Sequence, residues 1–576
     1  MKQNLKQTAR ERFAAMTLFL LICLPFSLVQ AQTVKVNGRV TDDLNEPMIG
    51  VSIVEKGTAN GCITDIDGNY TLNVKQGATL VYSYIGYVAL ERKAVAGVMN
   101  IILKEDAQAL DEVVVVGYGV QKKSSVTGAI SQVKSEDIQN RSITRAEEAL
   151  QGKTAGVQLV STTSQPGSSP TIRIRGFSSN GTSDPLYVVD GLIVNDLSSI
   201  DPNNIKSMEV LKDAASAAIY GAQAGNGVVL ITTKSGSQGT SSISYDFQYS
   251  INSLARRPEL LNSQEYLTQM KEADPTFTDV NIRELISNGV WDGVSSTDWY
   301  DVAFNASPAS RHTVTFQGAN DKGSYFLSLN NLYDNGIIRE DRDTYKRLSV
   351  MLNADYKIKP WLKVGTTANY ANYTSKAISD GSGGTSYVSM IATVMTLAPY
   401  IADTYPADAL PTQMQAQIAN GFTLLQNANG DYYSCLGTME QVHPMVAIRM
   451  NDKKNTGNSL MGTLYANFTP IKDLVFTTRL GYRIATDNTY THNNLYYGSA
   501  SASNKDRNGV TRTSLSTTYY QWENFVNYNT TLLDTHNISA MLGMSYSQSD
   551  QIYVSAGVDK IAKDNLLYAD VDWPAG

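Results

Sequence analysis

Strict alternation of apolar and polar side chains dominates the chain from about residue 241 onward. In the stretch 345–358 the apolar positions lie two residues apart: Leu348, Val350, Leu352, Ala354, Tyr356 and Ile358. The stretches 361–375 and 474–486 repeat this pattern. A period of two predicts β-strands with one apolar and one polar face, and ~9–11 tilted residues are enough to cross a hydrocarbon layer. Arg479 lies inside the last run, where a charged side chain fits a water-filled lumen better than a packed core.

The lengths of the connections between these strands carry a second signal. We place nine strands, near residues 241–253, 310–320, 324–334, 345–358, 361–375, 458–469, 474–486, 515–530 and 536–549. Short connections alternate with longer ones, of which the longest run over 254–309 and 376–457. Outer-membrane barrels have short turns on one side and long loops on the other, whereas a soluble sandwich has no reason to sort its loops in this way. We therefore predict a β-rich protein with a transmembrane antiparallel β-barrel over 237–576.

Nine strands cannot close such a barrel. The number is odd, and a sheet of this size could not surround the domain that precedes it. We therefore expect the barrel to be incomplete here and the sequence to be the N-terminal portion of a longer protein. If the chain ends at Gly576, a binding-only remnant is the alternative.

The first 31 residues predict an export signal that is removed from the mature protein. Its basic region contains Lys2, Lys6, Arg10 and Arg12. A largely apolar stretch over 13–28 follows, and Val29-Gln30-Ala31 supplies a small-residue cleavage site. After cleavage only Cys62 and Cys435 remain, and two cysteines do not make a disulfide framework. No later run approaches the ~18 apolar residues of a transmembrane helix.

Two further domains are predicted ahead of the barrel. Short strands separated by turn signals over 32–105 predict a β-sandwich. Asp65 to Asn69 has the acidic spacing of a calcium loop, but the glutamate that an EF-hand needs is missing, and a β-turn is the better interpretation. Over 120–236 we expect a helix at 142–151 and a strand followed by a helix at 205–220, which predicts a compact mixed α/β domain.

Two arginines of the α/β domain share one face of a short predicted strand at 171–175. Arg173 and Arg175 alternate with Ile172 and Ile174, and side chains two residues apart on a strand point the same way. A solvated face is one interpretation, and charge pairing to a surrounding wall is the other. The second makes both arginines candidate contacts between this domain and the barrel.

A nine-residue stretch lies in the linker at 106–119, between the two small domains. It consists of Asp111, Glu112, Val113, Val114, Val115, Val116, Gly117, Tyr118 and Gly119. Four consecutive valines favour an extended strand, because each loses χ1 freedom in a helix. An exposed strand offers free backbone donors and acceptors to the sheet edge of a partner. The alternative is an ordinary buried strand.

Composition narrows the classes of function. The net charge is −7 and 18% of the residues are charged, with no basic run that would argue for nucleic acid. Tyrosine is abundant, at 33 residues against 13 Phe and 5 Trp, which is typical of a β-rich protein with aromatic side chains at a polar boundary. The histidines, His312, His443, His492 and His536, lack metal-ligand spacing. We therefore predict no catalytic residue, no metal and no cofactor.

Many short motifs occur in one order along the chain. Those of the sandwich lie at 36–42, 57–58, 64–70 and 82–87, and those of the α/β domain at 150–157, 172–176, 187–191, 209–214 and 226–234. With these motifs the chain resembles the SusC-like TonB-dependent transporters of the Gram-negative outer membrane. They match the carboxypeptidase-regulatory-like extension and the plug of that family, and Asp111–Gly119 matches its TonB box. One departure is Gln223, where the family usually carries an arginine that contacts the barrel.

The resemblance implies active import by a multi-pass barrel in outer-membrane lipid. TonB, energised by ExbB–ExbD, would capture Asp111–Gly119 by strand addition and pull until the plug rearranges. The family also implies a SusD-like surface lipoprotein as a lid, and an oligosaccharide or sometimes a peptide as ligand. Trp291, Trp299, Tyr400 and Tyr405 could stack on sugar rings, although girdle or loop-packing roles are the stronger expectation.

Three other classes compete with this interpretation. An iron-chelate or siderophore receptor shares the fold, but the regulatory-like extension argues against it. A receptor that signals to a regulator needs an additional N-terminal domain, for which there is no room between Gln32 and the sandwich. An enzyme is the weakest alternative, because the extension is named after a non-catalytic sandwich and no catalytic constellation is seen.

Overall fold

The computed structural model describes residues 33–561, apart from 44–45, 59, 85–86, 88, 105–112, 117–118, 123–129, 140, 142, 162, 164, 178–182, 237–240, 379–388, 437–440 and 533–535. The predicted export signal at 1–31 lies outside the described residues. The chain divides into two compact units, one of Met1–Val114 with Gln121–Val126 and one of Val115–Val120 with Thr127–Gly576.

The first unit contains a β-sandwich. Its described strands are β1 (Thr33–Thr41), β2 (Ser52–Glu55), β3 (Gly61–Ile63), β4 (Asn69–Lys75), β5 (Thr79–Ser83), β6 (Leu90–Lys93), β7 (Gly97–Val98) and β8 (Ile101–Ile102). One sheet has the order β4-β1-β7, with β8 also paired to β1, and the other has the order β3-β2-β5-β6. Val36 and Ile53, one from each sheet, are fully buried in the core. Asp65 accepts hydrogen bonds from the N–H groups of Asp67 (3.0 Å) and Asn69 (2.8 Å), which confirms the predicted β-turn.

The α/β domain of the second unit, hereafter the plug, is built on a five-stranded sheet with the order β11-β16-β17-β14-β15. These strands are β11 (Ile130–Lys134), β14 (Leu186–Val189), β15 (Leu192–Val194), β16 (Ile205–Leu211) and β17 (Val228–Thr233). A hairpin of β12 (Val157–Val160) and β13 (Thr171–Ile174) and the short helices α2 (Ser135–Gln139), η2 (Ala146–Leu150), η3 (Pro202–Asn204), α3 (Ala214–Ala217) and η4 (Ala218–Ala224) complete it. Nearly every residue of β16 and β17 is buried, as expected of strands covered on both faces.

The helix expected at 142–151 is wrong in extent, because only the 3-10 turn η2 forms there. Arg145 is extended, with φ −122° and ψ 145°. Its guanidinium pairs with Glu147 at 2.8 Å, and both side chains are 3% exposed. It also donates to the carbonyl oxygen of Gly167 at 3.1 Å. A buried charge needs its partners, so this ion pair overrides the local helical pattern.

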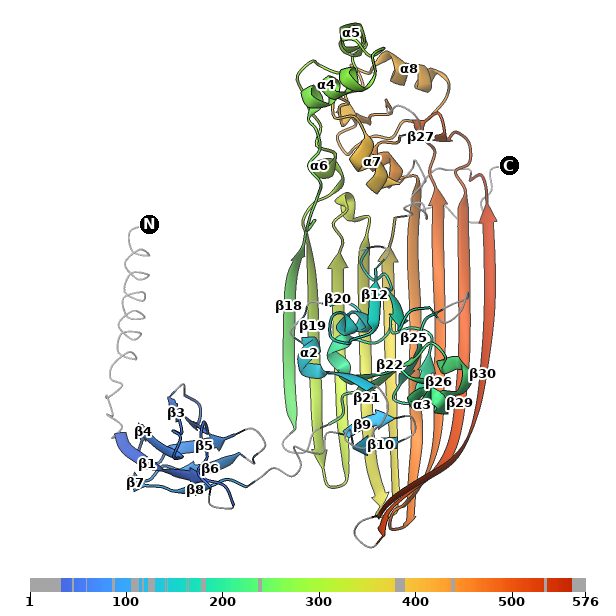
Figure 1. Ribbon diagram of the computed structural model, residues 1–576. Coiled ribbons are helices and arrows are strands. Elements are labelled where there is room, and N and C mark those ends of the chain that lie inside the picture. The colour runs from blue at the N-terminus through green and yellow to red at the C-terminus, as the bar shows by residue number, and fades with distance from the viewer. Residues whose placement is uncertain are drawn as a thin grey trace, which may run out of the picture. The chain divides into compact units, whose positions relative to one another are not determined.

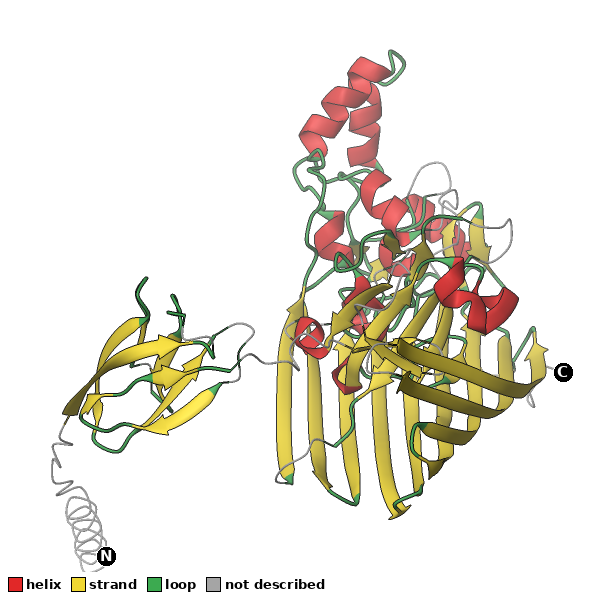
Figure 2. Ribbon diagram, turned by 60° about the horizontal axis from the view of Figure 1, so that its bottom comes forward, coloured by secondary structure: helices red, strands yellow, loops and turns green. Residues whose placement is uncertain are grey.

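A large antiparallel sheet, hereafter the wall, follows the plug in the second unit (Figures 1 and 2). Its nine strands are β18 (Ser242–Asn252), β19 (Ser307–Asn320), β20 (Gly323–Asn335), β21 (Thr344–Lys359), β22 (Leu362–Lys376), β25 (Asn451–Ile471), β26 (Leu474–Asn493), β29 (Val510–Leu532) and β30 (His536–Val558). Each predicted strand overlaps one of them. The strands pair in sequence order, so that β18 and β30 are the two edges and the sheet does not close.

The two faces of the wall have opposite character. On β21 the side chains of Arg347, Ser349 and Met351 are buried, at 2% exposure or less, and point toward the plug. Leu348 lies between Arg347 and Ser349, and Leu352 follows Met351; the two leucines are 49% and 36% exposed. This is the predicted alternation, with leucines outward and a mainly polar set inward, to which Met351 is the apolar exception.

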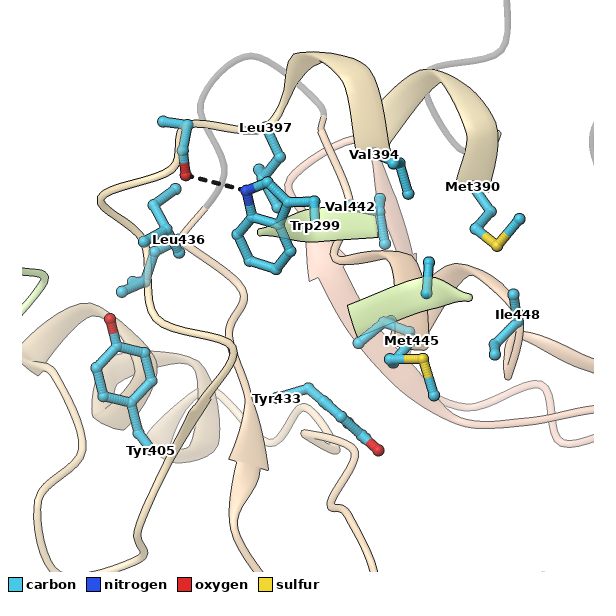
Figure 3. Packing of buried hydrophobic residues seen from close by; sticks show 14 of the residues in the cluster. Trp299, Met390, Val394, Leu397, Tyr405, Tyr433, Leu436, Val442, Met445 and Ile448 are labelled. Atoms are coloured by element: carbon cyan, nitrogen blue, oxygen red, sulfur yellow. Dashed lines mark hydrogen bonds between the residues drawn. The ribbon is translucent and has the colours of Figure 1, made fainter. Parts of the chain in front are cut away.

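The long connections of the wall are not open loops but fold into a helical cap. It contains α4 (Ser263–Ala273), α5 (Asp279–Ser287), α6 (Trp299–Ala303), η5 (Arg339–Asp341), α7 (Met390–Thr396), β23 (Thr404–Tyr405), α8 (Thr412–Ala419), β24 (Tyr432–Tyr433), α9 (Pro444–Ala447), β27 (Tyr496–Ser499) and β28 (Ala502–Asn504). Residues from separate connections share one apolar core around Trp299 (Figure 3). No helix in the described ranges is long and apolar enough to span a membrane.

The cap core accounts for the aromatic residues that the sequence singled out. Trp291, Trp299, Tyr400 and Tyr405 are all buried, at 9% exposure or less. Trp299 donates through Nε1 to the carbonyl oxygen of Ala398 at 3.2 Å. Their loop-packing role is confirmed, and rings buried in this way cannot stack on a sugar. Elsewhere in the two units, Cys62 and Cys435 are both free.

Candidate functional site: the plug and its contacts with the wall

The stretch expected to bind TonB lies partly within the described residues. Val113–Val116 form the strand β9, which pairs with β10 (Gly119–Lys122) in a two-stranded sheet. Asp111, Glu112, Gly117 and Tyr118 lie outside the described residues. The valines are extended, as expected, and their role in binding a partner stays a prediction.

A tight turn between β14 and β15 lies directly against the wall. Gly191 has φ +85°, in the left-handed region that favours glycine. A Cβ atom on Gly191 would lie 1.9 Å from Nη1 of Arg479, so any side chain here would force the guanidinium of Arg479 to move. Arg479 Nη1 lies 3.5 Å from the carbonyl oxygen of Asp190, and the guanidinium pairs with Glu523 at 2.6 Å. Arg479 therefore faces inward, as its position predicted, but it contacts the plug.

Gln521 of β29 holds the same turn through its side-chain amide. Its Nε2 donates to the carbonyl oxygen of Gly191 at 2.9 Å, and its Oε1 accepts from the N–H of Ile193 at 3.2 Å. The side chain is 4% exposed, so both hydrogen bonds are shielded from water. Two neighbouring wall strands thus fix the backbone of one plug turn.

A buried ion pair joins the plug to β21. Arg347 Nη2 lies 2.7 Å from Oδ2 of Asp201, and the two side chains are 1% and 0% exposed. Arg347 also donates through Nη1 to the carbonyl oxygen of Ser198 at 2.9 Å. On the next strand, Asn369 donates to the carbonyl oxygen of Ser199 at 2.9 Å. The segment that follows β15 is therefore held by a charge and by two backbone contacts.

Other wall strands reach the plug at its periphery. Arg311 of β19 donates to the carbonyl oxygen of Ile143. Asn353 of β21 donates to the carbonyl oxygen of Lys234 at 3.2 Å, just after β17 ends. These contacts repeat one chemistry, in which a wall side chain donates to a plug carbonyl.

The carboxyl group of Asp190 is turned toward the interior of the plug. It accepts hydrogen bonds from the N–H (3.0 Å) and the hydroxyl (2.6 Å) of Thr233. Burial raises the pKa of Asp190, while the hydrogen bonds from Thr233 and the charge of Arg479 oppose that rise. The carboxyl group thus ties the turn to β17 within the plug while its backbone carbonyl faces the wall.

The two edges of the plug sheet differ in their surroundings. β15 is one edge, and the turn before it is the one that Arg479 and Gln521 contact. β11 is the opposite edge and is the first plug strand after the predicted TonB box. β11 is fastened to β16 by backbone pairing and by Gln132, whose Nε2 donates to Glu209 at 2.8 Å. Burial raises the pKa of Glu209.

The two arginines predicted to touch the barrel have different surroundings. Arg173 pairs with Asp184 of the plug at 2.7 Å, and its guanidinium lies 5.3 Å from the centre of the Phe177 ring. Arg175 follows β13 in a left-handed conformation, with φ 57°, and its N–H donates to the carbonyl oxygen of Gly156. These contacts lie within the plug, and a role of either arginine in binding the barrel stays a prediction.

Sequence reasoning missed the residues that hold the plug in the structure. Arg347, Gln521 and Asp201 received no attention, although Arg347 occupies an inward position next to Leu348. A charged residue on the polar face of an alternating strand is the signal that could have identified such a contact. In the sequence this signal was used only for Arg479. In the described part of the chain no group of three or more His, Cys, Asp or Glu residues could hold a metal ion.

Two family models match parts of the chain. A model of the TonB-dependent receptor plug domain matches residues 122–228, and a model of the CarboxypepD_reg-like domain matches residues 36–115. The chain is 34% identical to the TonB-dependent receptor SusC of Bacteroides thetaiotaomicron over 81% of this chain and 47% of that protein. It is 30% identical to the TonB-dependent receptor P26 of Formosa agariphila over 94% of this chain and 51% of that protein. The chain thus spans about half the length of the curated relatives it matches.

Solved structures show the same fold. The RagAB peptide importer in its open-open state has a TM-score of 0.65 and 23% identity, covering 81% of this chain and 52% of that chain. The structure of the RagAB peptide transporter has a TM-score of 0.63 and 23% identity, covering 78% of this chain and 51% of that chain. These relatives are receptors and transporters, not enzymes, which agrees with the prediction.

Proposed function

Because this chain belongs to the SusC-like TonB-dependent receptors, we propose that it forms part of a transporter that imports a nutrient across the outer membrane. In this proposal residues 1–31 direct export and 32–105 form the regulatory-like extension. Residues 106–119 carry the TonB box, 120–236 form the plug, and 237–576 contribute the N-terminal portion of the barrel.

The observation that carries the proposal is a folded domain held inside a curved amphipathic sheet. The outer face of the wall is apolar, which suits a bilayer, and the inner polar face is occupied by the plug. A lumen filled in this way conducts nothing until the plug moves. Since the outer membrane has no ATP or ion gradient of its own, the energy must arrive mechanically, through TonB supplied by ExbB–ExbD.

We assign TonB binding to Asp111–Gly119. Val113–Val116 would supply a strand to a sheet edge of TonB, and Gly117 and Gly119 would supply hinge freedom. One edge of this strand is already paired with Gly119–Lys122, so TonB must use the other edge or displace this pairing. Arg173 and Arg175 are assigned to charge contacts with the barrel.

The proposed ligand is an oligosaccharide, captured under a SusD-like lipoprotein lid, because such ligands are usual in this family. A peptide is the alternative that the RagAB peptide importer supports through its similar fold. A siderophore receptor is a second alternative, and rescue of growth by a ferric chelate would favour it.

The test uses the protein in its native outer membrane. Deletion of Asp111–Gly119 should abolish uptake of labelled oligosaccharides and leave their binding at the cell surface intact. Val115→Pro should do the same, because proline removes a backbone donor from the strand, whereas Val115→Ala keeps that donor and should retain uptake. Uptake that survives the deletion would overturn the proposal.

A further inference from the structure

An apolar groove of about 570 Å³ lies on the outer face of the wall. It crosses the neighbouring strands β21, β22, β25 and β26, whose ribbons are labelled in Figure 1. Its lining includes Ala354, Tyr356, Thr366, Leu464, Ala466 and Leu480. Tyr356, Leu464 and Leu480 are 51%, 49% and 41% exposed, and they are among the alternating side chains that point away from the plug. The groove is therefore outside the lumen and separate from the plug contacts.

A patch of small side chains creates the depression. Ala354 lies opposite Thr366 on the neighbouring strand, and Ala466 lies opposite Thr478. The exposed surface of the lining is mostly apolar. The hydroxyl of Thr478, the polar group of the lining nearest to β29, accepts a hydrogen bond from Nε1 of Trp522 at 3.2 Å. Hence the groove suits an apolar chain.

An aromatic row lies beside the groove, toward the short turns. The rings of Trp361 and Phe468 stack with centroids 6.3 Å apart, and those of Phe468 and Phe476 are 6.0 Å apart. Phe468 lies two residues nearer the turn than Ala466 and points to the same face. Aromatic girdles mark the boundary between headgroups and hydrocarbon in barrels of this kind. The groove therefore opens into the hydrocarbon layer just inside that boundary.

Positive charge lies beyond the aromatic row. Lys359 ends β21 beside the turn to β22, and Lys472 lies in the turn between β25 and β26; both are exposed. The neighbouring carboxylate of Asp473 accepts a hydrogen bond from Thr530 at 3.2 Å and so is directed toward β29. Both lysines therefore lie in or beside turns at the end of the wall where the aromatic row lies, the level at which anionic headgroups are expected.

We propose that this groove binds one acyl chain of an anionic phospholipid, whose phosphate is held by Lys359 and Lys472. The acyl chain fills the space left by Ala354, Thr366 and Ala466 and gains van der Waals contacts along both sides of the groove. The assignment rests on the membrane location in the proposed function, but not on TonB or on the nature of the imported ligand.

The test measures phospholipid retained by the protein extracted from outer membranes in mild detergent, by native mass spectrometry. We expect one tightly held phospholipid per protein copy, enriched in anionic headgroups relative to the membrane. Ala466→Phe fills the groove and should lower retention at least tenfold. Ala540→Phe is the matched control, since Ala540 is exposed on β30 opposite Tyr528, away from the groove, and this variant should retain the lipid.

Replacement of both Lys359 and Lys472 by Gln should keep a bound lipid but remove the preference for anionic headgroups. Equal retention in the two Phe variants, or complete loss of lipid from the unmodified protein on mild washing, would overturn the proposal. So would a change from dimer to monomer in Ala466→Phe without a change in lipid, because the groove would then be an interface between copies. Deletion of Asp111–Gly119 should not affect retention, so the two proposals fail independently.

Discussion

Arg347→Ala should loosen the plug from the wall far more than the loss of an exposed charge does. Asp201, the partner of Arg347 at 2.7 Å, is fully buried, so the substitution removes the cation that pairs directly with its carboxylate at a place that water does not reach. Breaking a buried pair by removing one partner costs about 3–5 kcal/mol. At about 1.4 kcal/mol per factor of ten, local opening of this part of the plug should rise by a factor on the order of 10² to 10³.

Hydrogen–deuterium exchange of the protein in detergent or nanodiscs measures this opening directly. Peptides that cover 196–211 should exchange faster in Arg347→Ala, while those of β29 and β30 should not change. Lys346→Ala is the control, because Lys346 is the adjacent residue on the opposite face and its ammonium lies 5.1 Å from the centre of the Tyr333 ring. It should behave as the unmodified protein does.

A second substitution separates the unpaired charge from the lost packing. Asp201→Asn removes the stranded carboxylate and keeps an acceptor for the N–H of Asn203, which Asp201 caps at 2.9 Å. Combined with Arg347→Ala, it should therefore restore part of the protection. Exchange in Arg347→Ala no faster than in Lys346→Ala would refute the reasoning.

Three further predictions concern single residues. Gly191→Ala should displace the turn at the wall and unfold at a lower temperature than Gly152→Ala, which has a similar φ of +72° but no atom within 4 Å of an added Cβ; equal losses would show that collision is not the cause. Burial raises the pKa of Asp343 to about 7, so the protein should lose stability as the pH rises from about 4 to about 7. Asp343→Asn should flatten that decline, as measured by thermal unfolding followed by tryptophan fluorescence. Trp299→Ala should cost about 3–5 kcal/mol and loosen the cap, whereas Trp361→Ala, at 50% exposure, should cost much less; similar losses would contradict the role of the cap core.

The wall could be predicted because its two faces meet different surroundings. An apolar exterior and a polar interior impose a period of two, and that period is visible in the sequence without any knowledge of the fold. The ends of the strands could be predicted less well. β26 continues to Asn493, beyond the predicted end at 486, and its last residues are mostly polar on both faces. Where neither face is apolar the alternation carries no signal, although the backbone pairing continues.

The contacts of the plug were beyond sequence reasoning for a different reason. Arg347 and Asp201 are separated by 146 residues, and nothing local to either one reveals the other. The predicted helix at 142–151 failed on the same ground, because Arg145, held in its buried pair with Glu147, is extended and the helix begins only after it. Motif resemblance located the turn at Asp190 and Gly191 but not its partner on the wall.

The chemistry of the interface suits a domain that must be both held and released. Among the described residues, only Met461 and Tyr519 of the wall join the buried apolar cluster of the plug, whereas several wall side chains donate to plug carbonyls. A hydrogen bond contributes only about 0.5–1.5 kcal/mol net, because water replaces the lost partner once it enters. Apolar side chains of the plug core gain no such replacement partner when they are exposed to water. Separating the plug from the wall should therefore cost less per unit area than unfolding its core, provided that water can follow the movement.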